Sequence, residues 1–576
     1  MLTRRRTRSN ASVKLALAGF TVVSLAAACA PSTPSVHADP RSAGSEADAS
    51  RTPVAPLVVK AAATNQAVIR LTTDPDRPGR IVGELRLEGS LGAVKVLRFQ
   101  PSHGAQLETM AARDAAGEIE VRRSTDAFGT RLELGRAGTS PLDVRYAVTF
   151  AAGGDVAYAP FAEPIEMSAG GEDVLVLPDT TERFPVELHL KTGGVASGAA
   201  SSFALGNEQH FVARPSELRG AYFFAGDVGT ATFHGSDGDD FAAWLGFTAF
   251  DPRWVSAEVA GIRSAVDAYV GRTTTASAPP NSIMFAATRR DDFPVSVSSR
   301  TRGVVISVDR RASWNPPVRI TVTQALMRRY VGGLLFVGDP RDEATGAFFS
   351  EGFSRAVARE LLFDAGWLTA MDRAAELNAL LATLAFGESP RVLAATRGAL
   401  VATGLDVALR TRSAGKGSLK TFLRERLAQA ANDKKDTLSY DDFAARVTES
   451  AGEPFAREME AALLKGAEVR LPPDLVGPCF RLVAKQLVPF ELGFVTSSAD
   501  VMTVESVKAG SRAEAAGVRV GDVVSEVHYE AGRSSVPVNL VVVRNERKVT
   551  LRFLPAGAAK PGRQFERVPG LPDDRC

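Results

Sequence analysis

The spacing of apolar residues changes twice along the chain, and each change limits the possible folds. From Val68 to Phe233, short segments alternate apolar and polar residues, and turn sequences such as DPDRPGR and GRAGTSP separate them. This two-residue period predicts strands, and regular short strands joined by turns favour a β-sandwich-like domain. Helical periodicity follows over residues 240–470, and the remaining C-terminal part returns to strands.

The middle part of the chain is expected to be mainly helical and to be entered through a small α/β element. Thr369, Ser389 and Ser439 each stand directly before an apolar-periodic segment and are expected to cap its helix. An earlier amphipathic helix is predicted over residues 252–272. Its buried face would consist of Val255, Val259, Ile262, Val266 and Val270.

Length and charge narrow the class of protein. With 576 residues, the chain is too long for one domain. Its 68 Lys and Arg residues nearly balance 66 Asp and Glu residues, so no strongly basic surface is expected and nucleic acid is not a predicted partner. Beyond the N-terminus, no segment is expected to be apolar over the roughly 18 residues that a membrane-spanning helix needs.

The N-terminus has the pattern of an export signal. A basic segment, an apolar segment and the small residues before Cys29 predict a signal peptide over residues 1–29. The sequence AAAC resembles the lipobox of bacterial lipoproteins, which implies lipidation of Cys29. A cleaved signal without lipid is the alternative. Residues 30–60 are rich in Pro, Ser, Ala and Asp, and they are expected to form a disordered tether.

The segment FELGFVTSSADVMTVESVKAGSRAEAAGVRVGDVVSEVHYE, near the C-terminus, resembles a PDZ domain. Glu491-Leu492-Gly493-Phe494 matches the loop with which that family binds peptide carboxylates. The resemblance implies that the backbone N–H groups of Leu492, Gly493 and Phe494 hold the C-terminal carboxylate of a peptide or protein partner. The alternative is a β-rich unit that binds no ligand.

Two further segments carry a wider resemblance. FFSEGFSRAVARELLFDAGWLT and RGALVATGLDVALRTRSAGKGSLKTFL are similar to segments of glycyl-aminopeptidase-type zinc metallopeptidases with a C-terminal PDZ domain. The resemblance implies a multidomain α+β fold with a thermolysin-like (gluzincin) helical domain. The expected divisions are the β-sandwich-like domain at 61–239, the metallopeptidase-like domain at 240–472, and the PDZ domain with its tail at 473–576.

The zinc-binding pattern of that family is missing from this chain. Family members carry His-Glu-x-x-His on the helix that precedes a third ligand, a glutamate. Here ITVTQALMRRYVGG puts Gln324 and Arg328 at the histidine positions and Ala325 at the general-base position, while Glu351 retains the glutamate. Neither Gln nor Arg replaces an imidazole ligand, so zinc and catalysis are predicted absent. The alternative is an ordinary core helix in an unrelated fold.

Histidines elsewhere in the chain are the other candidate zinc ligands. None of the six histidines lies in the helical part, and convergence of His189, His210 and His234 is a separate alternative. Since a guanidinium can replace part of the charge of a lost cation, Arg328 is expected to lie within about 4 Å of Glu351.

The chain has three cysteines, Cys29, Cys479 and Cys576. With Cys29 assigned to the lipid, export predicts a disulfide between Cys479 and Cys576, with two free thiols as the alternative.

Together these patterns predict a metallopeptidase-like pseudoenzyme of the bacterial cell envelope, on its periplasmic side or surface. The protein would contact the membrane only through its lipid anchor and would bind peptides or proteins through the former active-site cleft, the PDZ domain or both. Two alternatives remain: an active aminopeptidase or endopeptidase with a rearranged site, and a structural envelope protein.

Overall fold

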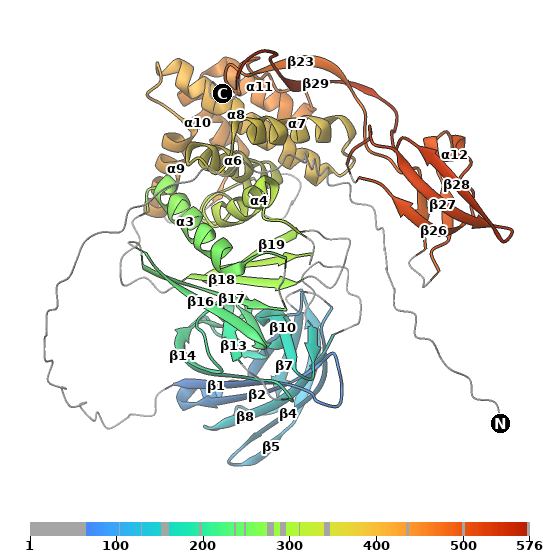
Figure 1. Ribbon diagram of the computed structural model, residues 1–576. Helices are drawn as coiled ribbons and strands as arrows, with labels where there is room; N and C mark the ends of the chain where they lie inside the picture. Colours follow the sequence, from blue (N-terminus) through green and yellow to red (C-terminus); the bar gives the residue numbers. More distant parts are fainter. Residues whose placement is uncertain are drawn as a thin grey trace, which may run out of the picture.

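The computed structural model describes residues 65–572, apart from residues 103, 128, 151–160, 195–197, 236–237, 247–248, 273–280, 288–294, 310–311, 339–345, 434–436, 498–500 and 531. The predicted signal peptide, the predicted tether, Cys29 and Cys576 lie outside these residues. A β-rich unit, a unit combining one sheet with most of the helices, and a small β unit follow one another along the chain (Figure 1).

The first unit contains three sheets whose inward side chains share one core. The seven-stranded sheet has the order β14 (Glu208–Ala213), β12 (Phe184–Lys191), β1 (Gln66–Thr73), β2 (Arg80–Glu88), β8 (Leu142–Thr149), β4 (Gln106–Asp114) and β5 (Gly117–Ile119). One four-stranded sheet has the order β13 (Gly198–Ser201), β15 (Tyr222–Gly226), β10 (Glu166–Gly170) and β9 (Phe161–Glu163). The other has the order β11 (Leu177–Pro178), β3 (Val96–Phe99), β7 (Gly129–Leu134) and β6 (Val121–Asp126). Short helical segments η1 (Gly89–Ala93), α1 (Gly171–Val174) and α2 (Pro215–Arg219) connect strands.

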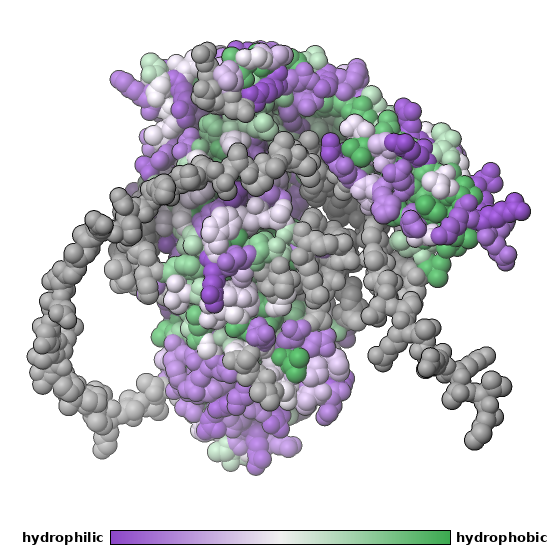
Figure 2. Space-filling model, in the orientation of Figure 1, coloured by the Kyte–Doolittle hydropathy of each residue, from purple (hydrophilic) through white to green (hydrophobic). Residues whose placement is uncertain are grey.

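Some strands of this unit follow the predicted alternation, whereas β10, β13 and β15 are buried along nearly their whole length. Along β2, every second residue is buried. The alternate residues of β2 are partly exposed, and the visible surface of this unit is mainly hydrophilic (Figure 2). This is the pattern of antiparallel sheets with one face on a core.

A five-stranded sheet begins the second unit. Its order is β16 (Val228–Gly235), β17 (Gly238–Leu245), β18 (Asn281–Ala287), β20 (Gly303–Val308) and β19 (Val295–Arg300). The expected division between residues 239 and 240 falls within β17, so the sheet places the division before Val228 instead. Alternation alone could not locate it, because a strand has the same period whichever sheet it joins.

Helices cover one side of this sheet and form the rest of the unit (Figure 1). They are α3 (Pro252–Val270), α4 (Pro316–Met327), the π-helical turn η2 (Phe348–Phe353), α6 (Ser354–Asp364), α7 (Ala370–Phe386), α8 (Pro390–Arg412), α9 (Leu419–Asp433), α10 (Tyr440–Ala451) and α11 (Glu453–Lys465). The short strands β21 (Phe336–Val337) and β22 (Thr437–Leu438) pair in parallel. All five residues predicted for the inner face of α3 are buried.

The predicted helix starts are confirmed by their hydrogen bonds. The Thr369 hydroxyl accepts from the Asp372 N–H, the Ser389 hydroxyl accepts from the Val392 N–H, and the Ser439 hydroxyl accepts from the Asp442 N–H. Each bond satisfies a backbone donor that the helix leaves unpaired.

Among the described residues, α8 is long and apolar enough to cross a membrane, which the sequence analysis did not expect. However, 56% of its most apolar stretch is buried inside the protein. Its side chains contribute to the core of the helical unit, as in a central helix of a globular domain.

The third unit begins with β23 (Phe480–Leu487) and ends with β29 (Lys560–Arg567), and these two strands pair as an antiparallel ribbon. The ribbon is held on α7, where the Asn378 side chain donates to the Phe565 carbonyl at 3.0 Å and accepts from the Phe565 N–H at 2.7 Å. The unit has its own core. It contains β24 (Phe494–Thr496), β25 (Val504–Val507), α12 (Arg512–Ala515), β26 (Val523–His528), β27 (Val538–Arg544) and β28 (Arg547–Phe553).

Candidate functional site

Helix α4 lies between the edge strand β19 and α6, and Gln324, Ala325 and Arg328 are at its C-terminal end. The Gln324 side-chain amide donates to the main-chain carbonyl of Glu351 at 2.9 Å. Ala325 is buried, and its carbonyl accepts from the Ser299 hydroxyl of β19 at 2.7 Å. The exposed Arg328 forms the C-cap of α4. The structure therefore brings Gln324 to the segment that contains Glu351.

The expected ion pair between Arg328 and Glu351 is wrong. Arg391 takes that place, with Nη2 at 2.6 Å and Nε at 3.1 Å from Glu351 Oε1. Arg328 forms no ion pair with any described residue. Its position at the exposed end of α4 explains the difference, because the first turn of α8 lies closer to Glu351.

Two glycines allow that close approach of α8 to η2. A Cβ on Gly398 would lie 1.9 Å from the Phe348 carbonyl oxygen, and a Cβ on Gly352 would lie 2.4 Å from the Ala395 carbonyl oxygen. Side chains at either position would therefore separate the two helices. Sequence reasoning missed Arg391, and its only sequence signal is its place just after the Ser389 cap.

The residues after α4 form a polar joint between elements. The Tyr330 hydroxyl donates to Asp267 Oδ1 at 2.5 Å, and the Arg329 guanidinium donates to the Gly303 carbonyl at 2.6 Å. Arg263 binds Asp267 at 2.8 Å. Burial and the bond to Asp267 raise the pKa of Tyr330, which keeps this hydroxyl protonated. The aromatic residue of RRYVGG thus has a structural role that involves no metal.

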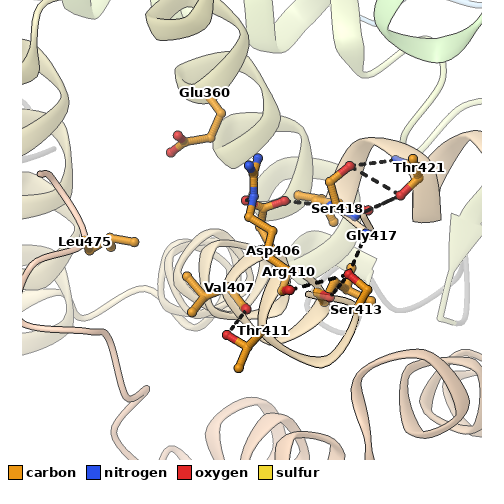
Figure 3. Close-up of polar contacts among 12 residues, drawn as sticks. Glu360, Asp406, Val407, Arg410, Thr411, Ser413, Gly417, Ser418, Thr421 and Leu475 are labelled. Atoms are coloured by element: carbon orange, nitrogen blue, oxygen red, sulfur yellow. Dashed lines mark hydrogen bonds and ion pairs between the residues drawn. The ribbon is translucent and has the colours of Figure 1, made fainter. Parts of the chain in front are cut away.

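The GLDVALR and GKGSL sequences also have a structural role, which Figure 3 shows around Asp406. Asp406 Oδ1 accepts from the Leu419 N–H at 2.7 Å, and Oδ2 accepts from Arg410 Nε at 2.6 Å. The Ser413 hydroxyl accepts from the Gly417 N–H at 2.5 Å. These bonds fix the turn between α8 and α9, so Asp406 has a defined role in joining the two helices.

The alternative of a three-histidine site gains no support. His189 Nε2 lies 2.6 Å from Glu187, and His210 Nε2 lies 3.1 Å from Glu208, both in the seven-stranded sheet. His234 belongs to β16, in the five-stranded sheet. Within the described residues, no three His, Cys, Asp or Glu side chains are grouped so that they could hold a metal ion.

The structure places Leu492 and Gly493 in a loop and Phe494 directly after them, as the first residue of β24. Gly493 has φ +76°, and its carbonyl accepts from the Lys508 N–H at 2.9 Å. Leu492 and Phe494 are partly buried against the core of the small unit. A Cβ on Gly493 would lie 2.7 Å from the Ser511 Cβ, so the loop needs glycine for its own packing.

Cys479 is fully buried at the start of the ribbon and is disulfide-bonded. Its predicted partner, Cys576, lies outside the described residues, so this pairing stays a prediction. Lipidation of Cys29, also outside them, stays a prediction as well.

Solved protein structures resemble the fold of this chain. An aminopeptidase N family protein from Idiomarina loihiensis matches with a TM-score of 0.61 at 14% identity, over 85% of this chain and 96% of that protein. The chain therefore has a mixed α+β multidomain fold similar to that of the M1 aminopeptidases. An M1 zinc metallopeptidase from Deinococcus radiodurans matches with a TM-score of 0.46 at 16% identity, over 72% of this chain and 96% of that protein. Native yeast LTA4 hydrolase matches with a TM-score of 0.44 at 12% identity, over 71% of this chain and 68% of that protein.

Comparison by sequence gave no match. No protein-family model matches the chain, and neither does any curated protein. The resemblance to solved metallopeptidases is therefore one of fold.

Proposed function

We propose that this chain is a metallopeptidase-like pseudoenzyme, a degenerate relative of the glycyl-aminopeptidase type, that binds peptides without hydrolysing them. The observation that carries the proposal is the Arg391–Glu351 ion pair at 2.6 Å. A glutamate that already binds a guanidinium is poorly placed to donate the same oxygen to zinc.

The residues around Glu351 do not fit a catalytic zinc ion. Zinc in peptidases is held by imidazole and carboxylate ligands, and a general base receives a proton from its bound water. Gln324 supplies an amide that is engaged with a main-chain carbonyl, and Ala325 has no group that accepts a proton. Arg391 places a positive charge at Glu351, which repels a dication. No zinc-dependent step is therefore assigned to this chain.

Peptide binding in the cleft is supported by the position of β19. This strand lies at the edge of the five-stranded sheet and packs against α4, which carries the replaced positions. An edge strand leaves backbone N–H and C=O groups on one side without a strand partner, and an extended peptide can pair with them. Such pairing needs no metal.

The small C-terminal unit is proposed to act as a PDZ domain that binds peptide C-termini. Among the residues that the structure describes, β24 pairs with β25 alone in a two-stranded sheet, which leaves one edge for an added strand. The unit also exposes apolar side chains that a partner could cover (Figure 2). They include Val495 on β24, and Val501 and Val520 outside strands.

The N-terminal pattern supports a place in the bacterial cell envelope, with Cys29 lipidated and the folded units on the periplasmic side or the surface. In this proposal, the lipid is the only contact with the membrane, and nucleic acid is not a partner. Mass spectrometry of membrane-extracted protein tests the anchor. A mature N-terminus without acyl chains would contradict it.

Metal analysis combined with peptide titration tests the main proposal. We expect no stoichiometric zinc after purification in zinc-containing buffer, no cleavage of peptide libraries, and saturable binding of some library peptides. One zinc per chain together with hydrolysis would establish the alternative of an active peptidase. Absence of both hydrolysis and peptide binding would favour the structural envelope protein.

The titration can also separate the two proposed binding surfaces. A peptide held by Leu492, Gly493 and Phe494 should lose affinity when its C-terminus is amidated, because the backbone N–H groups then lack a carboxylate. A peptide paired with β19 should bind almost equally well in both forms. Deleting the small unit is avoided, because its ribbon packs on α7 and its removal would expose that surface.

A further inference from the structure

A polar hollow of about 520 Å³ lies in the first β unit, far in sequence from both surfaces discussed above. The segment between β11 and β12 forms one side, and the residues from Arg214 through α2 form the other. Its lining consists of Asp179, Thr180, Thr181, Arg214, Ser216 and Arg219. No residue with an aliphatic or aromatic side chain lines it.

Arg219 is the unusual member of this group. Its Nε atom is buried and has no hydrogen-bond acceptor, and the guanidinium forms no ion pair with any described residue. Burial lowers the pKa of Arg219, although the group remains charged at neutral pH. Buried charged donors in proteins are usually paired, because an unpaired one loses its hydration without compensation.

The nearby carboxylates compensate Arg219 only in part, because Asp179 attracts the guanidinium without forming a hydrogen bond or ion pair with it. Asp179 binds Arg98 at 2.9 Å, and Glu217 of α2 forms an ion pair with Arg183. Arg214, on the rim of the hollow, is exposed, and its side chain has no partner in the described part of the chain. The lining thus holds two guanidinium groups without an ion-pair partner among the described residues, and one carboxylate that shares Arg98 with Asp126.

Hydroxyl groups complete the lining. Thr180 Oγ1 accepts from the Glu182 N–H at 3.2 Å and keeps its own proton for donation. The hydroxyls of Thr181 and Ser216 make no hydrogen bond within the described residues. Guanidinium forks together with hydroxyl donors match a tetrahedral oxyanion, which offers several acceptor oxygens around one centre.

We propose that this hollow binds a phosphate group, with Arg219 and Arg214 as its cationic ligands. The proposal is independent of the peptide-binding function. A free phosphate compound and a phospholipid headgroup would present the same chemistry to these residues.

Calorimetric titration of the full chain with inorganic phosphate tests the proposal, with chloride at matched ionic strength as the blank. We expect saturable binding that the blank does not reproduce. Arg219→Gln and Arg214→Gln should each weaken phosphate binding roughly tenfold or more, since each removes charge-assisted hydrogen bonds. Arg253→Gln is the matched control, because Arg253 is an exposed arginine of α3 without an ion pair among the described residues.

The two arginine variants also guard against a folding artefact. In phosphate-free buffer, Arg219→Gln should be at least as resistant to thermal unfolding as the wild type, because it removes a partly buried guanidinium whose Nε has no hydrogen-bond acceptor. If Arg219→Gln misfolds, Arg214→Gln still tests phosphate binding by the hollow, because Arg214 is exposed. Wild-type affinity in Arg214→Gln, or no binding above the chloride blank, would overturn the proposal.

A second experiment distinguishes a phospholipid headgroup from a soluble phosphate compound. Flotation with phosphatidylglycerol vesicles is compared with and without excess inorganic phosphate, using protein that lacks the lipid anchor. Vesicle binding that phosphate displaces and Arg219→Gln abolishes supports a lipid headgroup. Titration by inorganic phosphate without vesicle binding supports a soluble phosphate compound.

Discussion

Arg391 Nη2 lies 2.6 Å from Glu351 Oε1, and this ion pair joins the first turn of α8 to η2. In the proposed relationship to zinc metallopeptidases, Glu351 stands at the position of the third zinc ligand. Here its carboxylate binds a cation supplied by the protein itself. The pair thus gives Glu351 a role in joining α8 to η2.

Replacing Arg391 with Gln should have only a small effect on stability. The side chains of Arg391 and Glu351 are 46% and 20% exposed, so water screens their attraction. The free energy of unfolding should fall by about 0–1 kcal/mol, measured by urea denaturation. Arg253→Gln provides the baseline for losing an arginine without an ion pair. A loss above about 3 kcal/mol would show that the pair is a main support of the helical unit.

Local sequence signals predicted much of this fold. The alternation along β2 and the caps at Thr369, Ser389 and Ser439 depend on near neighbours in the sequence, and these predictions are confirmed. The division near Val228 was not located, because strand period does not reveal the sheet that a strand joins.

The candidate site was predictable only in part. Spacing along α4 placed Gln324 and Arg328 on a helix face toward Glu351, and the structure agrees for Gln324. The partner of Glu351 depends instead on how closely η2 approaches α8, which Gly352 and Gly398 permit. Contacts between segments so far apart in sequence leave no local sequence pattern. The sequence therefore predicted Arg328, and not Arg391, as the ion-pair partner of Glu351.

Asp406→Ala should destabilise the helical unit through the α8–α9 turn. The substitution removes the acceptor for the Leu419 N–H at the start of α9, as well as the partner of Arg410. Loss of a cap of this kind costs about 1–2 kcal/mol. Urea denaturation measures the loss, with Asp441→Ala as control, because Asp441 is an exposed acid in the first turn of α10. Equal effects of the two substitutions would show that the turn contributes nothing.

Gly493→Ala should strain the proposed carboxylate-binding loop itself. Gly493 has φ +76°, and a Cβ would lie 2.7 Å from the Ser511 Cβ. Gly517 has φ +90° in the same unit but faces open space, so Gly517→Ala isolates the cost of the backbone conformation. We expect Gly493→Ala to be more destabilising than Gly517→Ala by more than about 1 kcal/mol. Equal losses would mean that Ser511 moves away freely.

The predicted disulfide has a direct chemical test. Unfolded, non-reduced protein from an oxidising compartment should show no reactive thiol at Cys479 or Cys576. Cys576→Ser should then lower the free energy of unfolding by up to about 4–5 kcal/mol, because a loop of about a hundred residues is no longer closed. Cys29→Ser serves as control, since it removes the proposed lipid site and no predicted bridge. Two reactive thiols in the wild type would rule out the pairing.

Asp114 should make the stability of the first β unit depend on pH in the acidic range. The Arg136 guanidinium binds both carboxylate oxygens of Asp114, at 2.5 and 2.7 Å, and the Thr139 and Ala116 N–H groups donate to them as well. These hydrogen bonds, chiefly those from Arg136, hold the pKa of Asp114 well below its ordinary value of 3.8.

The sign of the effect follows from that lowered pKa. A carboxyl group with a lower pKa in the folded state adds stability at pH values above its unfolded pKa, and this contribution is lost as the pH falls from about 4 toward the folded pKa. Asp114→Asn removes the titrating group, so wild type and variant should differ most above about pH 5 and converge toward about pH 2. Chemical denaturation across that range measures the difference. A gap that stays constant with pH would show that Asp114 does not titrate between the folded and unfolded states.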